Sequence, residues 1–154
     1  MKFVTKEDIE CPIAHVFAQA SDFNGFERQA MRRGADVRKR DQLVRPGMGS
    51  GWDVTFKFRN KERQLKAEVT AWEPPNGYVV ASSSGGIDGT VLVELVPLSR
   101  NRTRLTVSIE LEPRTLGARL MVQSLKLARG TLQRRFELRV ADYASDIVER
   151  YRPS

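Results

Sequence analysis

The side chains best suited to chemistry in this 154-residue chain are few and far apart. His15 is the only histidine, so a Ser/His/Asp triad would have to use it, and a multi-histidine metal site is impossible. Cys11 is the only cysteine, which excludes an internal disulfide and a thiol-rich metal site. We interpret His15 as a solvent-facing helix residue and Cys11 as a small buried or edge residue. The sequence therefore predicts no metal, no cofactor and no dedicated catalytic motif.

The glycine-rich segment 47–51 could suggest a phosphate-binding loop. Such a loop must open a helix, whose amides then point at the phosphate, whereas Trp52 here begins a strand. We interpret the segment as a hairpin bend. The alternative is a flexible loop that gates a cavity, with Met48 as an adaptable apolar lip.

The positive charge of the chain is concentrated in one region. Residues 28 to 66 hold twelve Lys or Arg and four Asp or Glu, and the whole chain has a formal charge of +7. Such a patch attracts phospholipid headgroups, nucleic acid or an acidic small molecule, and composition does not choose among them. The alternative is an ordinary solvated face, because Asp36 and Asp41 are interleaved.

Apolar periodicity predicts the elements that position these residues. Phe3 to Glu10 alternates as a strand, Pro12 opens a short helix, and a second short helix covers Phe23 to Arg33 before Gly34. Period-two strands follow, separated by short turns rich in Gly, Pro and Asn. On them, Trp52, Val54, Phe56, Leu65, Val69, Leu105, Val107 and Ile109 share one face with apolar character. The strands should be antiparallel hairpin neighbours with one wet face.

The last quarter of the chain, Arg114 to Tyr151, has one continuous apolar stripe of helical period. A straight helix from Leu116 to Arg150 would reach about 50 Å, more than one sheet can cover. We therefore expect a bend near Gly117 or Gly130, or a protruding end.

Length and composition set the class of the molecule. The chain suits a single domain over 1-154, and its apolar runs fall short of the roughly 20 residues that cross a bilayer. The charged N-terminus lacks the apolar region of a signal peptide, and a single cysteine fits a reducing compartment. We expect a cytoplasmic protein.

This pattern resembles the START/Bet v 1-like superfamily, especially the SRPBCC or polyketide cyclase/dehydrase and lipid transport branch. The resemblance covers nearly the whole chain. Its carriers are the strand, Pro and helix opening from Ile9 to Asp22, the glycine-rich lead into Trp52, and the Glu73-Pro74-Pro75 turn. It implies an α+β helix-grip fold: a curved antiparallel sheet of six to seven strands wrapped around a long C-terminal helix, with two short helices after the first strand.

The resemblance also implies a cavity between the sheet and the final helix. We expect its wall to comprise the eight sheet residues above with Met121, Leu125, Leu132 and Phe136 of the helix. Small residues such as Ala67 and Gly89 would leave space among them. Polar candidates for the cavity are Glu7, Ser82 and Ser84, although a one-residue slip in register would reverse their faces. Arg28, Arg32, Arg33 and Arg38 should cluster at the mouth.

Three functions remain open at this stage. The first is non-catalytic binding or transport of a hydrophobic small molecule or lipid, with possible peripheral contact with an anionic membrane. The second is a polyketide aromatase/cyclase-like enzyme that uses polar groups in the same cavity, such as Glu7, Ser82, Ser84, Tyr78 or Arg63. The third is binding of nucleic acid or an acidic protein face by the basic region. Nucleic acid is not expected, because the aromatic residues share the inward face of the sheet.

Overall fold

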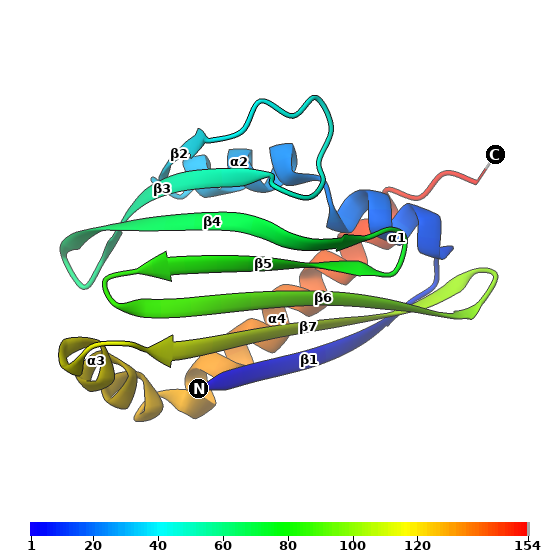
Figure 1. Cartoon of the computed structure of the whole chain (residues 1–154). Coiled ribbons are helices and arrows are strands. Elements are labelled where there is room, and N and C mark those ends of the chain that lie inside the picture. The colour runs from blue at the N-terminus through cyan, green and yellow to red at the C-terminus, as the bar shows by residue number, and fades with distance from the viewer. Residues whose placement is uncertain (154) are drawn as a thin grey trace.

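A computed structural model describes residues 1–153 as one antiparallel sheet with four helices (Figure 1). The strand order across the sheet is β1-β7-β6-β5-β4-β3-β2. The strands are β1 Lys2–Ile9, β2 Asp36–Lys39, β3 Gly51–Phe58, β4 Lys61–Glu73, β5 Gly77–Ser84, β6 Ile87–Ser99 and β7 Arg102–Pro113. The helices are α1 Ile13–Ala20, α2 Phe23–Arg32, α3 Leu116–Lys126 and α4 Arg129–Glu149. The predicted α+β helix-grip architecture is confirmed.

Consecutive strands from β2 to β7 pair as hairpin neighbours, and β1 joins the far edge beside β7. Segment 47–51 ends the connection between the paired strands β2 and β3, and its last residue, Gly51, begins β3, so it belongs to a hairpin bend, as predicted. Gly77 begins β5 with φ 147°, and a Cβ there would lie 2.0 Å from the carbonyl oxygen of Val93. Only glycine fits this close approach of two strands.

The two short helices connect β1 to β2, as expected from the sequence. Pro12 is the N-cap of α1, where its missing amide costs no hydrogen bond. The Asp22 side chain caps α2 by accepting from the amide of Gly25 at 3.1 Å. Gly34, at φ 95°, follows the end of α2 in the left-handed conformation.

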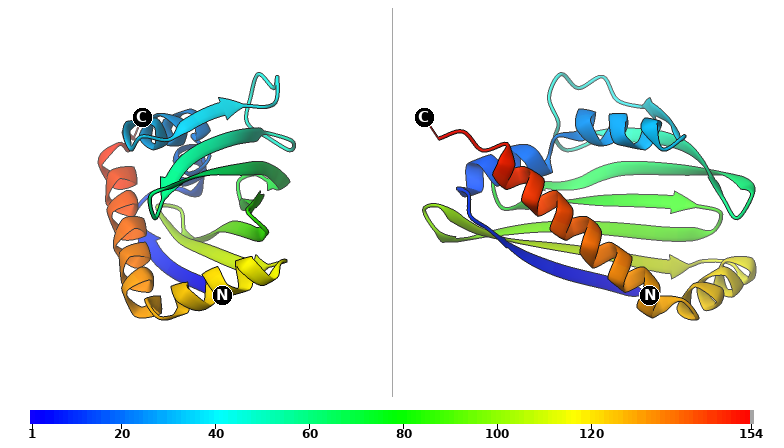
Figure 2. Two further views of the ribbon diagram at one scale, coloured as in Figure 1. Left: turned by 90° about the vertical axis from the view of Figure 1, so that its left-hand side faces the viewer. Right: turned by 180° about the vertical axis from the view of Figure 1, so that it is seen from behind.

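The C-terminal apolar stripe forms two helices instead of one bent helix. The break falls at Leu127 and Ala128, two residues before Gly130, and Gly117 lies within the first turn of α3. α4 runs diagonally across the concave side of the sheet, whereas α3 turns away at the end of β7 (Figure 2). The bend lets the apolar stripe follow two different parts of the sheet.

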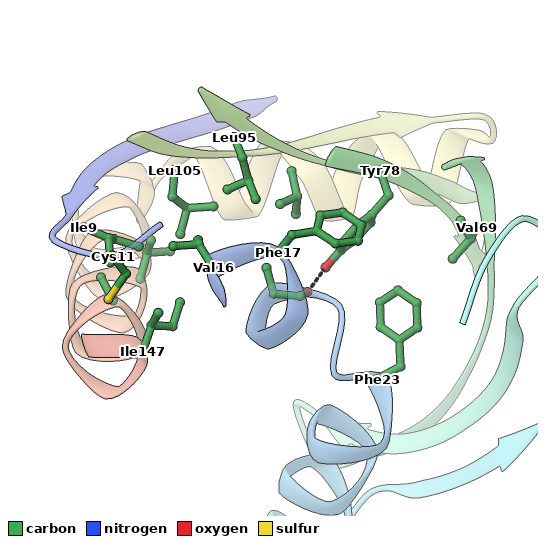
Figure 3. Close-up of a cluster of buried hydrophobic side chains, with 14 of the residues drawn as sticks. Ile9, Cys11, Val16, Phe17, Phe23, Val69, Tyr78, Leu95, Leu105 and Ile147 are labelled. Atoms are coloured by element: carbon green, nitrogen blue, oxygen red, sulfur yellow. Dashed lines mark hydrogen bonds between the residues drawn. The ribbon is translucent and has the colours of Figure 1, made fainter. Parts of the chain in front are cut away.

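The core lies between the concave sheet face, α1 and the second half of α4 (Figure 3). Its most deeply buried side chains include Ile9, Val16, Leu105 and Ile147. Paired residues of an antiparallel ladder lie on the same face, so the partners Leu95 and Leu105 both point toward the helices. The predicted inward face of the sheet is therefore the face that α4 covers.

α4 also covers the β1 edge of the sheet. Arg129 donates to the carbonyl of Lys2 at 3.2 Å, and Gln133 donates to that of Val4 at 3.1 Å. None of the helices within residues 1–153 has both the length and the apolar character needed to span a bilayer.

Candidate ligand-binding cavity

An apolar cavity of about 450 Å³ lies between the concave sheet face, α2 and α4. The sheet contributes residues of β2 to β7 that lie on one face, because only every second side chain points inward. α2 supplies Phe23, Phe26 and Ala30, which are spaced by three and four residues and so share one side of the helix. The complete lining is Ala20, Phe23, Phe26, Glu27, Ala30, Val37, Trp52, Val54, Ala67, Tyr78, Val80, Val91, Val93, Leu105, Val107, Phe136, Arg139, Val140 and Tyr143.

One end of this first cavity is walled by aromatic rings. Phe23 makes T-shaped contacts with Trp52 and Tyr78, at centroid distances of 5.1 and 5.3 Å. Such edge-to-face pairs add to the stabilisation from burial and hold the rings in fixed orientations. The shape of this wall is therefore set by packing before any ligand arrives.

Two tyrosines line the cavity, and the hydroxyl of each donates a hydrogen bond to a backbone carbonyl. Tyr78 donates to Ala20 at 2.5 Å, and Tyr143 donates to Gln19 at 2.6 Å. Burial raises the pKa of both phenols above the ordinary value. Neither hydroxyl is free to donate to a ligand, so their main contribution to the cavity is apolar ring surface.

The charged side chains of the lining are Glu27 and Arg139. Glu27 accepts a hydrogen bond of 2.5 Å from the indole Nε1 of Trp52. Within residues 1–153, every buried side-chain nitrogen or oxygen has a hydrogen-bond partner. No group of three or more His, Cys, Asp or Glu in that range could hold a metal ion. The described site is therefore mainly apolar. Of its two charged groups, Glu27 already accepts a hydrogen bond from another residue of the wall.

A second cavity, of about 420 Å³, adjoins the first along the same sheet face. Val54 of the first cavity pairs directly with Leu65 of the second, and Ala67 of the first pairs with Ser82 of the second. α3 covers this end through Ala118, Met121 and Leu125. The concave face therefore carries a trough with two compartments.

The second compartment is more polar than the first. Ser82 and Ser84 line it, and their hydroxyls donate to the carbonyls of Gly89 and Gln64 at 3.1 and 2.6 Å. Lys61 and Arg63 line it as well. A ligand with a polar or anionic end would find its complementary groups in this compartment.

Solved structures share this architecture over nearly their whole length. An aromatase/cyclase from Streptomyces superposes with a TM-score of 0.69 at 10% identity, covering 99% of this chain and 96% of that one. Norcoclaurine synthase from Thalictrum flavum, solved with dopamine and hydroxybenzaldehyde, gives 0.66 at 14% identity, covering 100% and 89%. A protein from Thermus thermophilus gives 0.67 at 14% identity, covering 97% and 98%.

The chain has the START/Bet v 1-like helix-grip fold. No protein-family model matches the sequence, and no curated protein sequence matches it. At such low identity the likeness extends to the fold alone, because helix-grip proteins place different chemistry on one scaffold.

The sequence-predicted wall residues divide between the two compartments of the helix-grip trough. Trp52, Val54, Leu105, Val107 and Phe136 line the first, and Phe56, Leu65, Met121 and Leu125 line the second. The remaining three line neither: Val69 is fully buried in the core, Ile109 pairs with Phe3 and Val91 on the concave face, and Leu132 is half-buried on α4.

The predicted polar and basic groups are more scattered. Ser82 and Ser84 face the second compartment, whereas Glu7 pairs with Leu105 on the concave face, is half-buried and lines neither compartment. The basic residues of α2 are exposed and outside the lining; they are Arg28, Arg32 and Arg33. Arg38 pairs with Asp53 on the convex face, and its guanidinium lies 3.4 Å from the carboxylate of Asp36. Its position on the convex face separates Arg38 from the trough.

His15 and segment 47–51 lie outside the trough. His15 is not solvent-facing, because its Nε2 lies 2.9 Å from the carbonyl oxygen of Ile147 and its ring packs 4.8 Å from that of Tyr151. It joins α1 to the end of α4. No residue of segment 47–51 lines either compartment, and Met48 is 62% exposed.

Sequence reasoning missed the contribution of α2, β5 and β6 to the first compartment. Phe23, Phe26 and Ala30 carried a helical spacing that marks an inward side, and the pairs Tyr78/Val80 and Val91/Val93 carried the period of two. Arg139 had no such signal, because it flanks the apolar stripe of α4 rather than lying in it.

Proposed function

We propose that this protein binds or transports a hydrophobic small molecule or lipid in the trough between its sheet and α4. The observation that carries the proposal is the first compartment, which is lined almost entirely by apolar side chains although it is large enough for a ligand. Protein interiors are normally closely packed, so an apolar space of about 450 Å³ is best explained by a ligand that fills it.

The energetics of such binding are favourable without dedicated chemistry. Burying about 300 Å² of apolar ligand surface gives roughly 7 kcal/mol before ordering costs. Since about 7 kcal/mol corresponds to a dissociation constant of roughly 10 μM and ordering costs reduce this energy, an acyl, isoprenoid or polycyclic body that buries this area should bind with a dissociation constant between about 10 μM and 1 mM.

We propose further that the ligand is amphipathic and occupies both compartments. Its apolar body fills the first, and an anionic or polar end lies in the second, near Lys61 and Arg63. Arg63 favours a carboxylate or phosphate because its planar guanidinium can donate two parallel hydrogen bonds.

The test is native mass spectrometry, with solvent extraction, of the protein purified from its own host. A stoichiometric lipid-like passenger is expected. In parallel, the purified protein is titrated with a dansyl-labelled fatty acid, and displacement by unlabelled lipids is followed. An empty protein that also fails to bind the dansyl probe would overturn the proposal.

The second candidate is an aromatase/cyclase-like enzyme acting on a ligand held in the same trough. Glu27 favours it, because a carboxylate in an apolar wall is placed to steer proton transfer. A Glu27→Gln variant keeps the acceptor for Trp52 but removes the base. Turnover of a polyketide mimic that disappears in Glu27→Gln, with probe binding retained, would establish catalysis.

We also propose a cytoplasmic location. Cys11 is a free, fully buried thiol, as suits a reducing compartment. Fractionation of the host with an antibody against the protein tests this, and recovery from an oxidising compartment would contradict it.

A further inference from the structure

α3 is apolar on two opposite sides. Its inner side packs against the sheet through Ala118 and Val122, which are 4% and 3% exposed. Its outer side carries Leu116 and Leu120, and Leu127 continues the same stripe at the helix end. These three leucines are 75%, 66% and 91% exposed. An isolated exposed leucine is unremarkable, but three in one row form a surface that needs a partner.

The surroundings of this stripe are strongly basic. Between Glu112 and Glu137 the chain has six Arg or Lys and no acidic residue. Arg119 and Lys126 are exposed on α3 itself and flank the leucines on one side. The charged residues beside the stripe on its own helix are therefore all cations.

The β3–β4 hairpin extends this surface. Arg59, at the hairpin tip, donates to the Ser124 hydroxyl of α3 at 2.9 Å. Phe58 is 38% exposed, and the guanidinium groups of Arg59 and Arg63 lie over its ring at 5.2 and 5.5 Å. The tip of the hairpin, residues 57–63, has one acidic residue, Glu62, which pairs across the strands with Lys57. Figures 1 and 2 show the hairpin tip and α3 at the same end of the molecule.

We propose that this surface, formed by α3 and the tip of the β3–β4 hairpin, docks on an anionic lipid bilayer. A helix lies in the membrane interface when it combines a row of large apolar side chains with Lys and Arg beside them. The leucines enter the boundary between headgroups and acyl chains, and the cations lie among anionic headgroups. A bilayer fits this surface better than a protein partner does, because the charged residues of α3 beside the leucines are all cations, and anionic headgroups match a charge of one sign.

Docking on this surface has a geometric consequence for the trough. The inner side of α3 covers the second compartment through Met121 and Leu125, so the docked protein holds that compartment next to the bilayer. The docking proposal does not depend on the trough having a ligand, since it rests first on the exposed leucines of α3, none of which lines the trough.

The test is co-sedimentation of the protein with vesicles of phosphatidylcholine alone or with about 30% phosphatidylserine. We expect binding to the anionic vesicles that weakens with salt. The triple variant Leu116→Ser/Leu120→Ser/Leu127→Ser should bind about tenfold more weakly or worse. The control Leu138→Ser/Val148→Ser removes two exposed apolar residues of α4, 58% and 44% exposed, and should bind like the parent.

Two charge variants separate this surface from the basic residues of α2. Arg119→Gln/Lys126→Gln should weaken binding to anionic vesicles severalfold, whereas Arg28→Gln/Arg32→Gln should not. Loss of binding only in the α2 variant, or equal binding to neutral and anionic vesicles, would overturn the proposal.

A site-specific label reports insertion directly. Cys11 is fully buried, so an introduced Leu120→Cys can be labelled selectively with the environment-sensitive dye NBD. Its fluorescence should rise and shift to the blue on anionic vesicles, and a label at Leu98→Cys, on β6 near the β6–β7 turn, should not respond. An unresponsive label at position 120 would also overturn the proposal. Binding of the dansyl fatty acid is measured without vesicles, so failure of docking and failure of ligand binding are distinguishable.

Discussion

The hydroxyl of Tyr78 donates a 2.5 Å hydrogen bond to the carbonyl oxygen of Ala20, the last residue of α1. Figure 3 shows this bond beside the ring of Phe17, which makes a T-shaped contact with Tyr78. The bond joins β5 to α1, and Tyr78 and Ala20 both line the first compartment. One side chain thus joins the sheet, a helix and the cavity wall.

Removing this hydroxyl should destabilise the fold. Tyr78→Phe leaves the buried carbonyl of Ala20 without its donor, which should lower the free energy of unfolding by about 1–3 kcal/mol. Urea denaturation followed by circular dichroism measures the loss. The matched variant Tyr143→Phe removes the donor to Gln19 at a half-buried position and should lose less. A larger loss in Tyr143→Phe would contradict the assignment of Tyr78 as the principal link.

The same two tyrosines should make the protein sensitive to alkali. Burial raises the pKa of both phenols in the folded state above the ordinary 10.0. Their neutral forms therefore stabilise the folded state fully below about pH 10, and this contribution is lost as pH rises further. The free energy of unfolding should fall above about pH 10, and the fall should be shallower in Tyr78→Phe/Tyr143→Phe. Parallel pH profiles for the two proteins would exclude this origin.

Filling the first compartment should block ligand binding. Ala67 pairs with Trp52 on the concave face and lines the compartment, so the ring of Ala67→Phe should occupy the ligand's space. We expect at least about tenfold weaker binding of the dansyl fatty acid. The control Lys66→Ala alters the neighbouring residue, which pairs with Asp53 on the convex face, and should bind normally. Unchanged binding by Ala67→Phe with an intact fold would place the ligand elsewhere.

Arg59 should hold α3 in place. Arg59→Ala removes the hydrogen bond to Ser124, so amide hydrogen exchange across Leu116–Lys126 should quicken severalfold while β6 and β7 stay protected. Lys57→Ala, two residues earlier on β3 and on the convex face, serves as the control. Equal exchange in α3 for both variants would show that the bond does not anchor the helix.

Gly130 offers a stabilising substitution. It lies in the first turn of α4, and a Cβ added there would meet no atom within 4 Å. Gly130→Ala should therefore raise the free energy of unfolding by about 0.4–1 kcal/mol, because it restricts the unfolded chain. Thermal and urea unfolding measure the gain, and a loss would mean that the break between α3 and α4 requires glycine.

Much of the fold could be predicted because one face of each element is buried. The alternation from Trp52 to Phe58 fixed a strand and its inward side, and the spacing of Ile13, Val16 and Ala20 fixed a helix. The apolar spacing does not mark the break at Leu127, because the stripe continues through it. The bend near Gly130 was predicted instead from the length of the segment, which exceeds what one sheet can cover.

The cavity was predictable only in part, for a related reason. Periodicity reports which side chains point inward, but not whether an inward side chain packs solidly or borders empty space. Val69 and Val54 carry the same sequence signal, yet Val69 is fully buried in the core while Val54 lines the first compartment. The curvature of the sheet and the placement of α2 decide between these outcomes.

The open sheet has two edge strands, β1 and β2, whose unpaired backbone groups could hydrogen-bond to a strand of another molecule. At β1, the side chains of Arg129 and Gln133 occupy outward carbonyls. β2 is four residues long and carries Asp36, Arg38 and Lys39. Short edge strands with charged side chains discourage such pairing. The sheet can therefore remain open, and wide enough to surround a ligand, without edge-to-edge aggregation.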